Sequence, residues 1–225
     1  MDLNENIMKY NVISSSSSGN AIIVDDILAL DVGVAYKKIK PYLDKVRIIF
    51  ISHIHKDHLN PKTIEQIVYN YPTIRFLSGN REVTKNLYLS GVQPSNIIYM
   101  PNDNKWYDMR LLKFKMQPVE HDVMNTCLHF EICGKKGLYV VDTNNVDDIK
   151  AKDYDLFLIE SNYKEEILQN HIMNCENDDE LFYLKRVPNT HLSYQQANSF
   201  LIQNMGRNSQ FEYIHKSSYN FEEEK

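Results

Sequence analysis

A short apolar strand that ends in a cluster of polar side chains constrains this chain more than any other feature. Residues 47–52 form an apolar, β-branched run bounded by polar residues, which is typical of a buried central strand. His53, His55, Asp57 and His58 follow at once. Residues i and i+2 of an extended chain point to the same side, so His53 and His55 can present two imidazoles to one ion. A turn after His55 would bring Asp57 and His58 to a second ion nearby.

Imidazole and carboxylate ligands together favour zinc, manganese or iron over calcium or magnesium. A single histidine is more often an ordinary polar residue than a ligand. Three histidines and an aspartate within six residues, at the end of a buried strand, are hard to explain structurally. The sequence therefore predicts a metal centre, and Asp57 and His58 are its candidate catalytic residues.

A centre with two metals needs further ligands, and suitable residues follow other predicted strands. His121 and Asp122 follow the strand that ends near residue 117, Asp142 ends the apolar strand 137–141, and His191 precedes a helix. Taken alone, each is better explained as a cap or a helix-entry residue. They become informative only through the pattern that they complete.

The order of the predicted elements indicates a layered fold. The segments expected to be strands are 8–13, 21–24, 27–31, 47–52, 111–116, 128–133, 138–141 and 155–160, and those expected to be helical are 36–45, 61–69 and 193–204. Two similar halves of strands and helices predict two sheets with helices outside, in an α/β (α+β) layered domain. We expect one domain over residues 1–225, with a frayed tail at 220–225.

Charge and composition exclude several classes. The formal charge of −5 is not that of a protein with a broad cationic surface for nucleic acid, although a local patch stays open. No apolar run approaches the ~20 residues of a membrane span, and the first ten residues lack the features of a secretory signal. The three cysteines are odd in number and form no C-x-x-C pair. We therefore expect reduced thiols and a cytoplasmic protein.

The complete pattern resembles the metallo-β-lactamase superfamily. It comprises His-x-His-x-Asp-His after a strand, a strand-end histidine, a strand-end aspartate and a later histidine. Ser17-Ser18-Gly19-Asn20, His121-Asp122, Glu160-Ser161-Asn162 and His191-Leu192-Ser193 narrow the resemblance to the YycJ/WalJ-like single-domain metallo-hydrolases of bacteria and phages. The resemblance covers roughly residues 8–217. It implies a four-layer αββα sandwich with two divalent metal ions, zinc or manganese or else iron, at the edge where the sheets meet.

The resemblance also implies a role for each candidate. His53, His55 and His121 would hold one metal, Asp57, His58 and His191 the second, and Asp142 would bridge the two. Asp31 resembles the early aspartate of the superfamily that supports the metal-binding loop, and Asp122 can orient His121. Where the subfamily continues with histidine or asparagine, this chain has Tyr163 and Tyr194. Those two departures affect substrate contacts and leave the ligands in place.

Two residues near the C-terminus are candidates for binding substrate. His215 and Ser217 lie where members of the superfamily often line the site. His215 can contact a phosphate or protonate a leaving oxygen, although it is equally well explained as a polar residue after a last strand.

The chemistry implied is hydrolysis of a phosphodiester by a hydroxide that the two metals share. The substrate would be nucleic acid, DNA in particular, or alternatively a small cyclic nucleotide or dinucleotide. A thioesterase or lactonase of the glyoxalase II-like kind is the alternative from another enzyme class. A non-catalytic binding protein is disfavoured, because all seven ligand positions hold competent residues. The sequence leaves the oligomeric state and the identity of the metal open.

Overall fold

The computed structural model describes residues 7–217 and contains two six-stranded sheets. The first sheet consists of β1 (Tyr10–Ser16), β2 (Gly19–Val24), β3 (Leu28–Leu30), β4 (Ile48–Phe50), β5 (Arg75–Ser78) and β6 (Ile97–Tyr99), in that spatial order. The second has the order β12-β11-β10-β9-β8-β7 and consists of β7 (Tyr107–Asp108), β8 (Lys113–Val119), β9 (Asn125–Ile132), β10 (Lys135–Val140), β11 (Leu156–Glu160) and β12 (Gln210–Ile214). Each sheet therefore combines antiparallel and parallel pairs.

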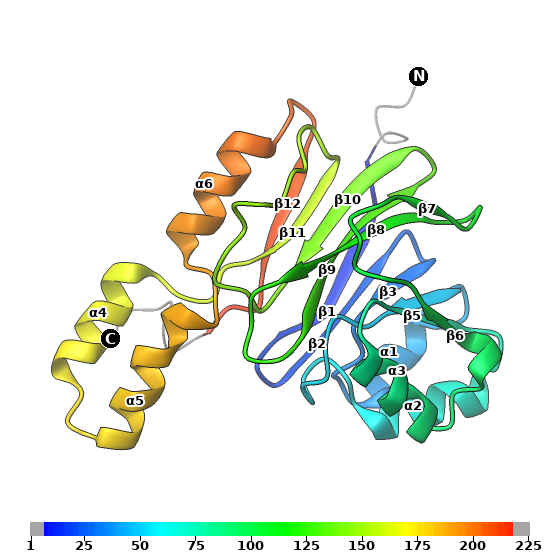
Figure 1. Ribbon diagram of the computed structural model, residues 1–225, viewed down its shortest axis with the longest axis horizontal. Coiled ribbons are helices and arrows are strands. Elements are labelled where there is room, and N and C mark those ends of the chain that lie inside the picture. The colour runs from blue at the N-terminus through cyan, green and yellow to red at the C-terminus, as the bar shows by residue number, and fades with distance from the viewer. Residues whose placement is uncertain (1–6, 218–225) are drawn as a thin grey trace.

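Helices lie outside the sheets (Figure 1). They are α1 (Tyr36–Ile39), α2 (Pro61–Asn70), α3 (Arg81–Leu89), α4 (Glu165–Asn174), α5 (Asp178–Arg186) and α6 (Tyr194–Asn204), with short 3-10 turns η2 (Lys40–Tyr42), η3 (Pro94–Asn96) and η4 (Val187–Asn189). Figure 1 shows α1–α3 beside the first sheet, α6 beside the second, and α4 and α5 as a hairpin that projects from one end. None of the helices within residues 7–217 has the length and apolar character required to span a membrane.

Three apolar layers pack the two sheets and the helices beside them, and a smaller cluster that includes Leu168 and Leu184 packs α4 against α5. Phe50 of β4 packs in the layer between the sheets with residues such as Phe114 and Leu158, whereas its neighbour Ile49 packs with the layer under α2 and α3. A third layer joins Phe157 to Phe200 of α6. Strand β4 is thus buried on both faces, which explains its unbroken apolar sequence. The expected αββα sandwich is confirmed.

The polar candidates gather where strands of both sheets end. Strands β3 to β6 are parallel, as are β10 to β12, and β8 runs in the same direction as β10. The residues that follow these strands therefore lie at a common edge, the usual place for a ligand site in such sheets. β1 and β2 pair as an antiparallel hairpin whose turn lies at residues 17–18.

The helices differ from the sequence expectations at two places. The helix expected over 36–45 is wrong in length, since α1 ends at Ile39 and passes into a 3-10 turn that contains Pro41. Proline has no amide hydrogen to continue a helical ladder, which accounts for the early end. The hairpin of α4 and α5 was not expected at all. The frayed tail expected at 220–225 lies outside the described residues.

Candidate metal centre

The loop that carries the histidine cluster is held by the start of β2 and by the chain that follows β3. The amide of Asn20 donates to the carbonyl of Asp57 at 2.7 Å, and the amide of Val32 donates to the carbonyl of His58 at 2.9 Å. At Gly33 any Cβ would lie 1.7 Å from the Asp57 carbonyl oxygen. Only glycine permits this approach, so Gly33 allows the loop to lie directly against the sheet.

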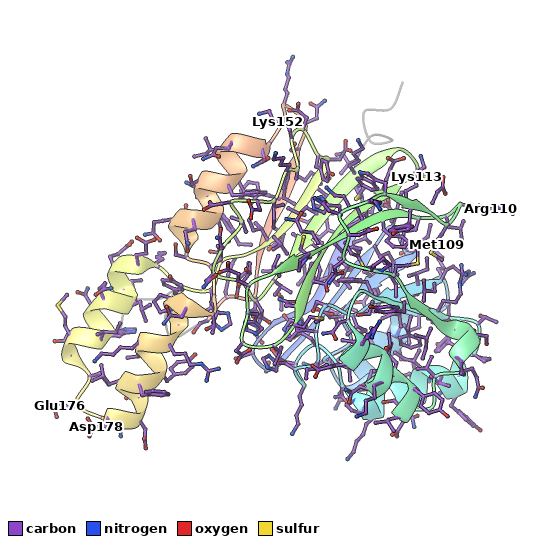
Figure 2. The ribbon with its side chains drawn as sticks, in the orientation of Figure 1. Met109, Arg110, Lys113, Lys152, Glu176 and Asp178 are labelled. Carbon is purple, nitrogen blue, oxygen red and sulfur yellow. The ribbon has the colours of Figure 1, made fainter. Side chains whose placement is uncertain are left out.

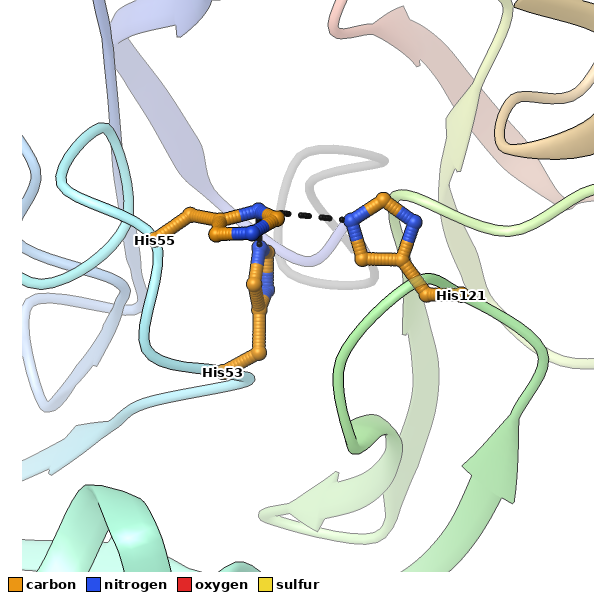
Figure 3. A group of neighbouring side chains, drawn as sticks. All are labelled: His53, His55 and His121. Atoms are coloured by element: carbon orange, nitrogen blue, oxygen red, sulfur yellow. Dashed lines mark hydrogen bonds between the residues drawn. The ribbon is translucent and has the colours of Figure 1, made fainter. Parts of the chain in front are cut away.

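His53, His55 and His121 form the first group of candidate ligands (Figure 3). His55 Nδ1 lies 3.1 Å from His53 Nε2 and 3.4 Å from His121 Nε2. Burial, and next the nearby His58, hold the pKa of His53 well below 6.5, and burial also lowers the pKa of His121. These two imidazoles are therefore neutral near pH 7, and each keeps a nitrogen lone pair that a metal can accept.

The donor chemistry of this first group fits a divalent cation. Its three ring nitrogens converge, and the histidine side chains differ in burial from His53, which is fully enclosed, to His55, which is partly exposed. The Nδ1 atom of His55 carries at most one hydrogen, which it cannot donate fully to both His53 and His121, so a cation would satisfy the converging nitrogens better. Three protein ligands, which can all be histidines, with a fourth position open to solvent are typical of a catalytic zinc site.

Asp57, His58, Asp142 and His215 form a second group. His58 Nε2 lies 2.8 Å from Asp142 Oδ2 and 3.3 Å from Asp57 Oδ2. His215 completes the group at 3.4 Å from Asp57 Oδ2 and 3.0 Å from Asp142 Oδ1. Burial opposes ionisation of Asp142, but His215 and His58 hold the pKa of its carboxyl well below the ordinary value.

Asp142 lies between the two groups. Its Oδ2 atom is 3.4 Å from His53 Nε2 in the first group and 2.8 Å from His58 Nε2 in the second. The side chain reaches this position because residue 142 leaves β10 with a φ of 49°. Asp31 and His215 also follow strands with positive φ, at 57° and 55°. Such left-handed conformations are uncommon for residues other than glycine and cluster at functional sites.

A third group joins His191 to Glu160. His191 Nδ1 lies 2.7 Å from Glu160 Oε1 and 3.2 Å from Asp142 Oδ1, and His215 Nδ1 lies 3.0 Å from Glu160 Oε1. Burial disfavours a charged imidazole, but Glu160 and Asp142 raise the pKa of His191 to about 9. Without metal these carboxylates hold protonated histidines, so an ion that binds here must displace protons.

Asp31 supports the cluster from below. Its carboxylate accepts hydrogen bonds from the Ser52 amide at 2.8 Å and the Tyr139 hydroxyl at 2.7 Å, and it lies 2.7 Å from His58 Nδ1. The side chain is fully buried. Because His58 meets Asp31 through Nδ1, its Nε2 atom faces Asp142. Carboxylates that orient metal-binding histidines in this way are common in metalloproteins.

Asp122 connects the first group to the helical hairpin. One of its oxygens lies 3.1 Å from His121 Nε2 and 3.6 Å from His55 Nε2, and the other accepts a hydrogen bond from Arg186 of α5. Figure 1 shows α5 at the end of the sheets where these loops lie. The hairpin thus brings a cation to the edge of the candidate centre.

A cavity of about 260 Å³ lies over the three groups. Metal-ligand candidates line it together with Ser17, Asn162, Arg186, Lys216 and Ser217. The amide of Ser217 donates to the carbonyl of Asn162 at 3.0 Å. The two expected substrate-binding residues, His215 and Ser217, therefore both border the cavity.

The structure brings all of the candidates from the sequence to this edge, with one difference in grouping. His215, expected only to bind substrate, lies with Asp57 and His58, whereas His191 lies with Glu160. Sequence reasoning gave Glu160, Tyr139 and Arg186 no role in the site. Glu160 had a signal, because it ends a buried apolar strand just as Asp142 does.

The curated relatives match this chain over part of its length. The chain is 38% identical over 99 residues to the cytidine monophosphate-N-acetylneuraminic acid hydroxylase of Gorilla gorilla gorilla, and 36% identical over 104 residues to that of Sus scrofa. The matched stretches cover 42% and 44% of this chain but only 16% and 24% of those proteins. No protein-family model matches the sequence.

Solved structures show similarity over nearly the whole chain. The metallo-β-lactamase fold protein YhfI from Bacillus subtilis has a TM-score of 0.69 at 13% identity, with 94% of this chain and 87% of that chain covered. The short form of human tRNase Z has a TM-score of 0.68 at 14% identity, with 93% and 92% covered. A diphosphatase of the PhnP family has a TM-score of 0.64 at 13% identity, with 94% and 87% covered. Together with the arrangement of the two sheets, these matches establish that the chain has the metallo-β-lactamase fold.

Proposed function

We propose that this protein is a hydrolase that uses two divalent metal ions to cleave phosphodiester bonds, with nucleic acid as its substrate. The observation that carries the proposal is the position of Asp142. One carboxylate oxygen lies within 3.4 Å of a histidine from each of two ligand groups. A carboxylate that reaches both groups suits a paired metal site, since the two ions in phosphatases and nucleases lie only about 3.5–4 Å apart.

The residues divide into three roles. His53, His55 and His121 would hold one ion, and Asp57 and His58 the other, with Asp142 between them. His191 or His215 would complete the second set, since both lie near Asp142. When bound, two such ions would supply an activated water at neutral pH and would stabilise charge on the phosphoryl oxygens.

Other residues around the cavity would bind the phosphate, orient the histidines and supply a proton. Arg186 and Lys216 border the cavity and can hold the non-bridging oxygens of a phosphate. Glu160 would keep His215 and His191 oriented through their Nδ1 atoms. If His191 completes the second set, His215 would be left beside Asp57, with its Nε2 atom 3.4 Å from Asp57 Oδ2, and could donate a proton to the leaving oxygen.

The solved structures support a phosphodiester more than a thioester or lactone. Among them are a tRNase and a diphosphatase, whose names indicate phosphate-containing substrates. The local similarity to a hydroxylase named for a cytidine monophosphate-linked sugar acid favours a second candidate, a small nucleotide-linked substrate at the same site.

One panel of substrates tests the proposal. Protein loaded with Zn²⁺ or Mn²⁺ is incubated with bis-p-nitrophenyl phosphate, single-stranded DNA and RNA, cyclic nucleotides, a cytidine monophosphate-sugar and a thioester. We expect turnover of bis-p-nitrophenyl phosphate and of the oligonucleotides, and loss of both in Asp142→Asn. Asp147→Asn, on an exposed loop after β10, is the matched control. Turnover of the thioester alone would reject the proposal, and turnover of the small nucleotides alone would select the second candidate.

A further inference from the structure

A series of hollows leads from the metal centre along α3 and the edge strand β6 of the first sheet. The cavity over the metal centre shares Asp122 with a neighbouring hollow of about 680 Å³. That hollow reaches Arg81 and Tyr99, which also line a third hollow of about 550 Å³. The first cavity alone, at about 260 Å³, is smaller than the ~300–1,000 Å³ of typical small-molecule pockets. A larger substrate must therefore extend outward.

We propose that a single-stranded polynucleotide runs from the metal centre over these hollows, along a surface that we call the α3 track. The α3 track consists of Arg81, Lys85 and Tyr88 of α3, Tyr99 at the end of β6, and Met124 of the loop after β8. This inference rests on the phosphodiesterase function proposed above and extends it to the substrate.

The side chains of the α3 track suit unpaired bases. The Arg81 guanidinium lies 5.8 Å from the centre of the Tyr99 ring, and Tyr99 and Tyr88 are 41% and 62% exposed. Lys85 is also exposed and follows Arg81 by one helical turn, so the two cations share one face of α3. Proteins that bind single strands stack bases on aromatic rings and guanidinium planes, and hold the phosphates with nearby cations.

One buried side chain fixes the α3 track relative to the candidate ligands. Asn80 Nδ2 donates to the carbonyl of Met124 at 2.7 Å, and its Oδ1 accepts from the amide of Glu82 at 2.8 Å. Asn80 thus caps α3 and also ties it to the loop that carries His121. Met124 is 57% exposed, lines the second hollow and offers an apolar contact for a sugar or a base. The path is built into the fold and does not depend on a loop closing.

The charge on the α3 track predicts how it binds. The charge of Arg81 is partly offset by Glu82 in the second hollow, whereas Lys85 lines the third hollow, and Asp122 is paired with Arg186. For a single strand, two phosphate contacts would give a slope of only about −1.4 in a plot of the logarithm of the association constant against the logarithm of the salt concentration. We therefore infer that stacking provides most of the affinity, which agrees with the net charge of −5. Duplexes, whose bases are already stacked, should be poor substrates.

The test compares large and small substrates in the same metal-loaded proteins. The quantity measured is the ratio of kcat/KM for a 12-nucleotide single strand, as DNA and as RNA, to kcat/KM for bis-p-nitrophenyl phosphate. We expect Arg81→Ala and Tyr99→Ala each to lower this ratio about tenfold, and Tyr99→Phe to retain it because the ring still stacks. Arg110→Ala is the control, since Figure 2 shows this arginine at the tip of the β7–β8 turn.

Each outcome has a definite meaning. An unchanged ratio in both alanine variants would overturn the α3 track while leaving the phosphodiesterase function intact. An equal loss in Tyr99→Phe and Tyr99→Ala would also overturn it, because stacking would not be the interaction lost. Wild-type turnover of bis-p-nitrophenyl phosphate with no cleavage of either strand would exclude a polynucleotide substrate. No turnover of any phosphodiester by the wild type would instead reject the underlying function.

Discussion

The substitution Asp31→Asn tests how the fold prepares the candidate metal centre. Asp31 is fully buried beneath the cluster and has a φ of 57°. Asparagine tolerates this left-handed backbone about as well as aspartate does, so the substitution removes the charge without adding backbone strain. The variant therefore isolates the contribution of the carboxylate.

The size of the effect follows from the contacts of Asp31. Four groups lie at hydrogen-bond distance: the Ser52 amide at 2.8 Å, the Ser52 hydroxyl at 2.8 Å, the Tyr139 hydroxyl at 2.7 Å and His58 Nδ1 at 2.7 Å. A hydrogen bond to a charged partner stabilises a protein by about 1 kcal/mol more than a neutral one. An amide also has one acceptor oxygen where a carboxylate has two. We expect the free energy of unfolding to fall by about 3–5 kcal/mol, as when a buried ion pair loses one partner.

Two measurements check this expectation. Urea unfolding of the metal-free protein at pH 8 gives the stability, and competition with a chelator gives the zinc affinity, which we expect to weaken about 10–100-fold. Asp26→Asn is the matched control: Asp26 also has a positive φ, of 60°, but it is exposed and forms an ion pair with Lys45. A loss of less than about 1 kcal/mol in Asp31→Asn, with unchanged zinc affinity, would refute the reasoning.

Three further predictions concern the site loop and the second sheet. Asp57→Ala should lower kcat/KM for bis-p-nitrophenyl phosphate to less than about a tenth of wild type with an unchanged circular dichroism spectrum, and higher activity would argue against two metals. Gly33→Ala should destabilise the protein by about 1–3 kcal/mol in urea, because its Cβ would lie 1.7 Å from the Asp57 carbonyl oxygen, and an unchanged midpoint would contradict this. Burial, and next the charge of Lys115, lowers the pKa of His129 from 6.5 to about 3 in the folded protein. As the pH falls, the unfolded chain therefore binds a proton at this histidine before the folded protein does. The free energy of unfolding should fall by about 2 kcal/mol between pH 7 and 5 because of this residue. That loss should disappear in His129→Leu but persist in Tyr154→Phe, and equal pH dependence in wild type and His129→Leu would refute it.

Much of the fold can be predicted from patterns of residues that are close together in the sequence. The spacing of two histidines at i and i+2 after an apolar strand predicts that His53 and His55 point to the same side of the chain. In the structure His53 Nε2 lies 3.1 Å from His55 Nδ1. The unbroken apolar sequence of β4 indicated a strand buried on both faces. These signals are readable because each depends on residues close together in sequence.

What sequence reasoning missed depends on contacts between distant residues. Glu160 and His215 are 55 residues apart and meet only because β11 and β12 are neighbours in one sheet. The Tyr139 hydroxyl reaches Asp31 across the space between the two sheets, over 108 residues of sequence. Arg186 reaches Asp122 through a helical hairpin whose position local propensity does not determine. The assignment of individual residues to one metal or the other likewise depends on tertiary distances.

The central claim is that this chain holds two metal ions around Asp142. Elemental analysis of protein purified without chelator, or reloaded with Zn²⁺ or Mn²⁺ and then desalted, tests it most directly. We predict two ions per chain in the wild type and fewer in Asp142→Asn, with Asp147→Asn still at two. A folded wild-type protein that binds one ion or none at saturating Zn²⁺ and Mn²⁺ would contradict the claim.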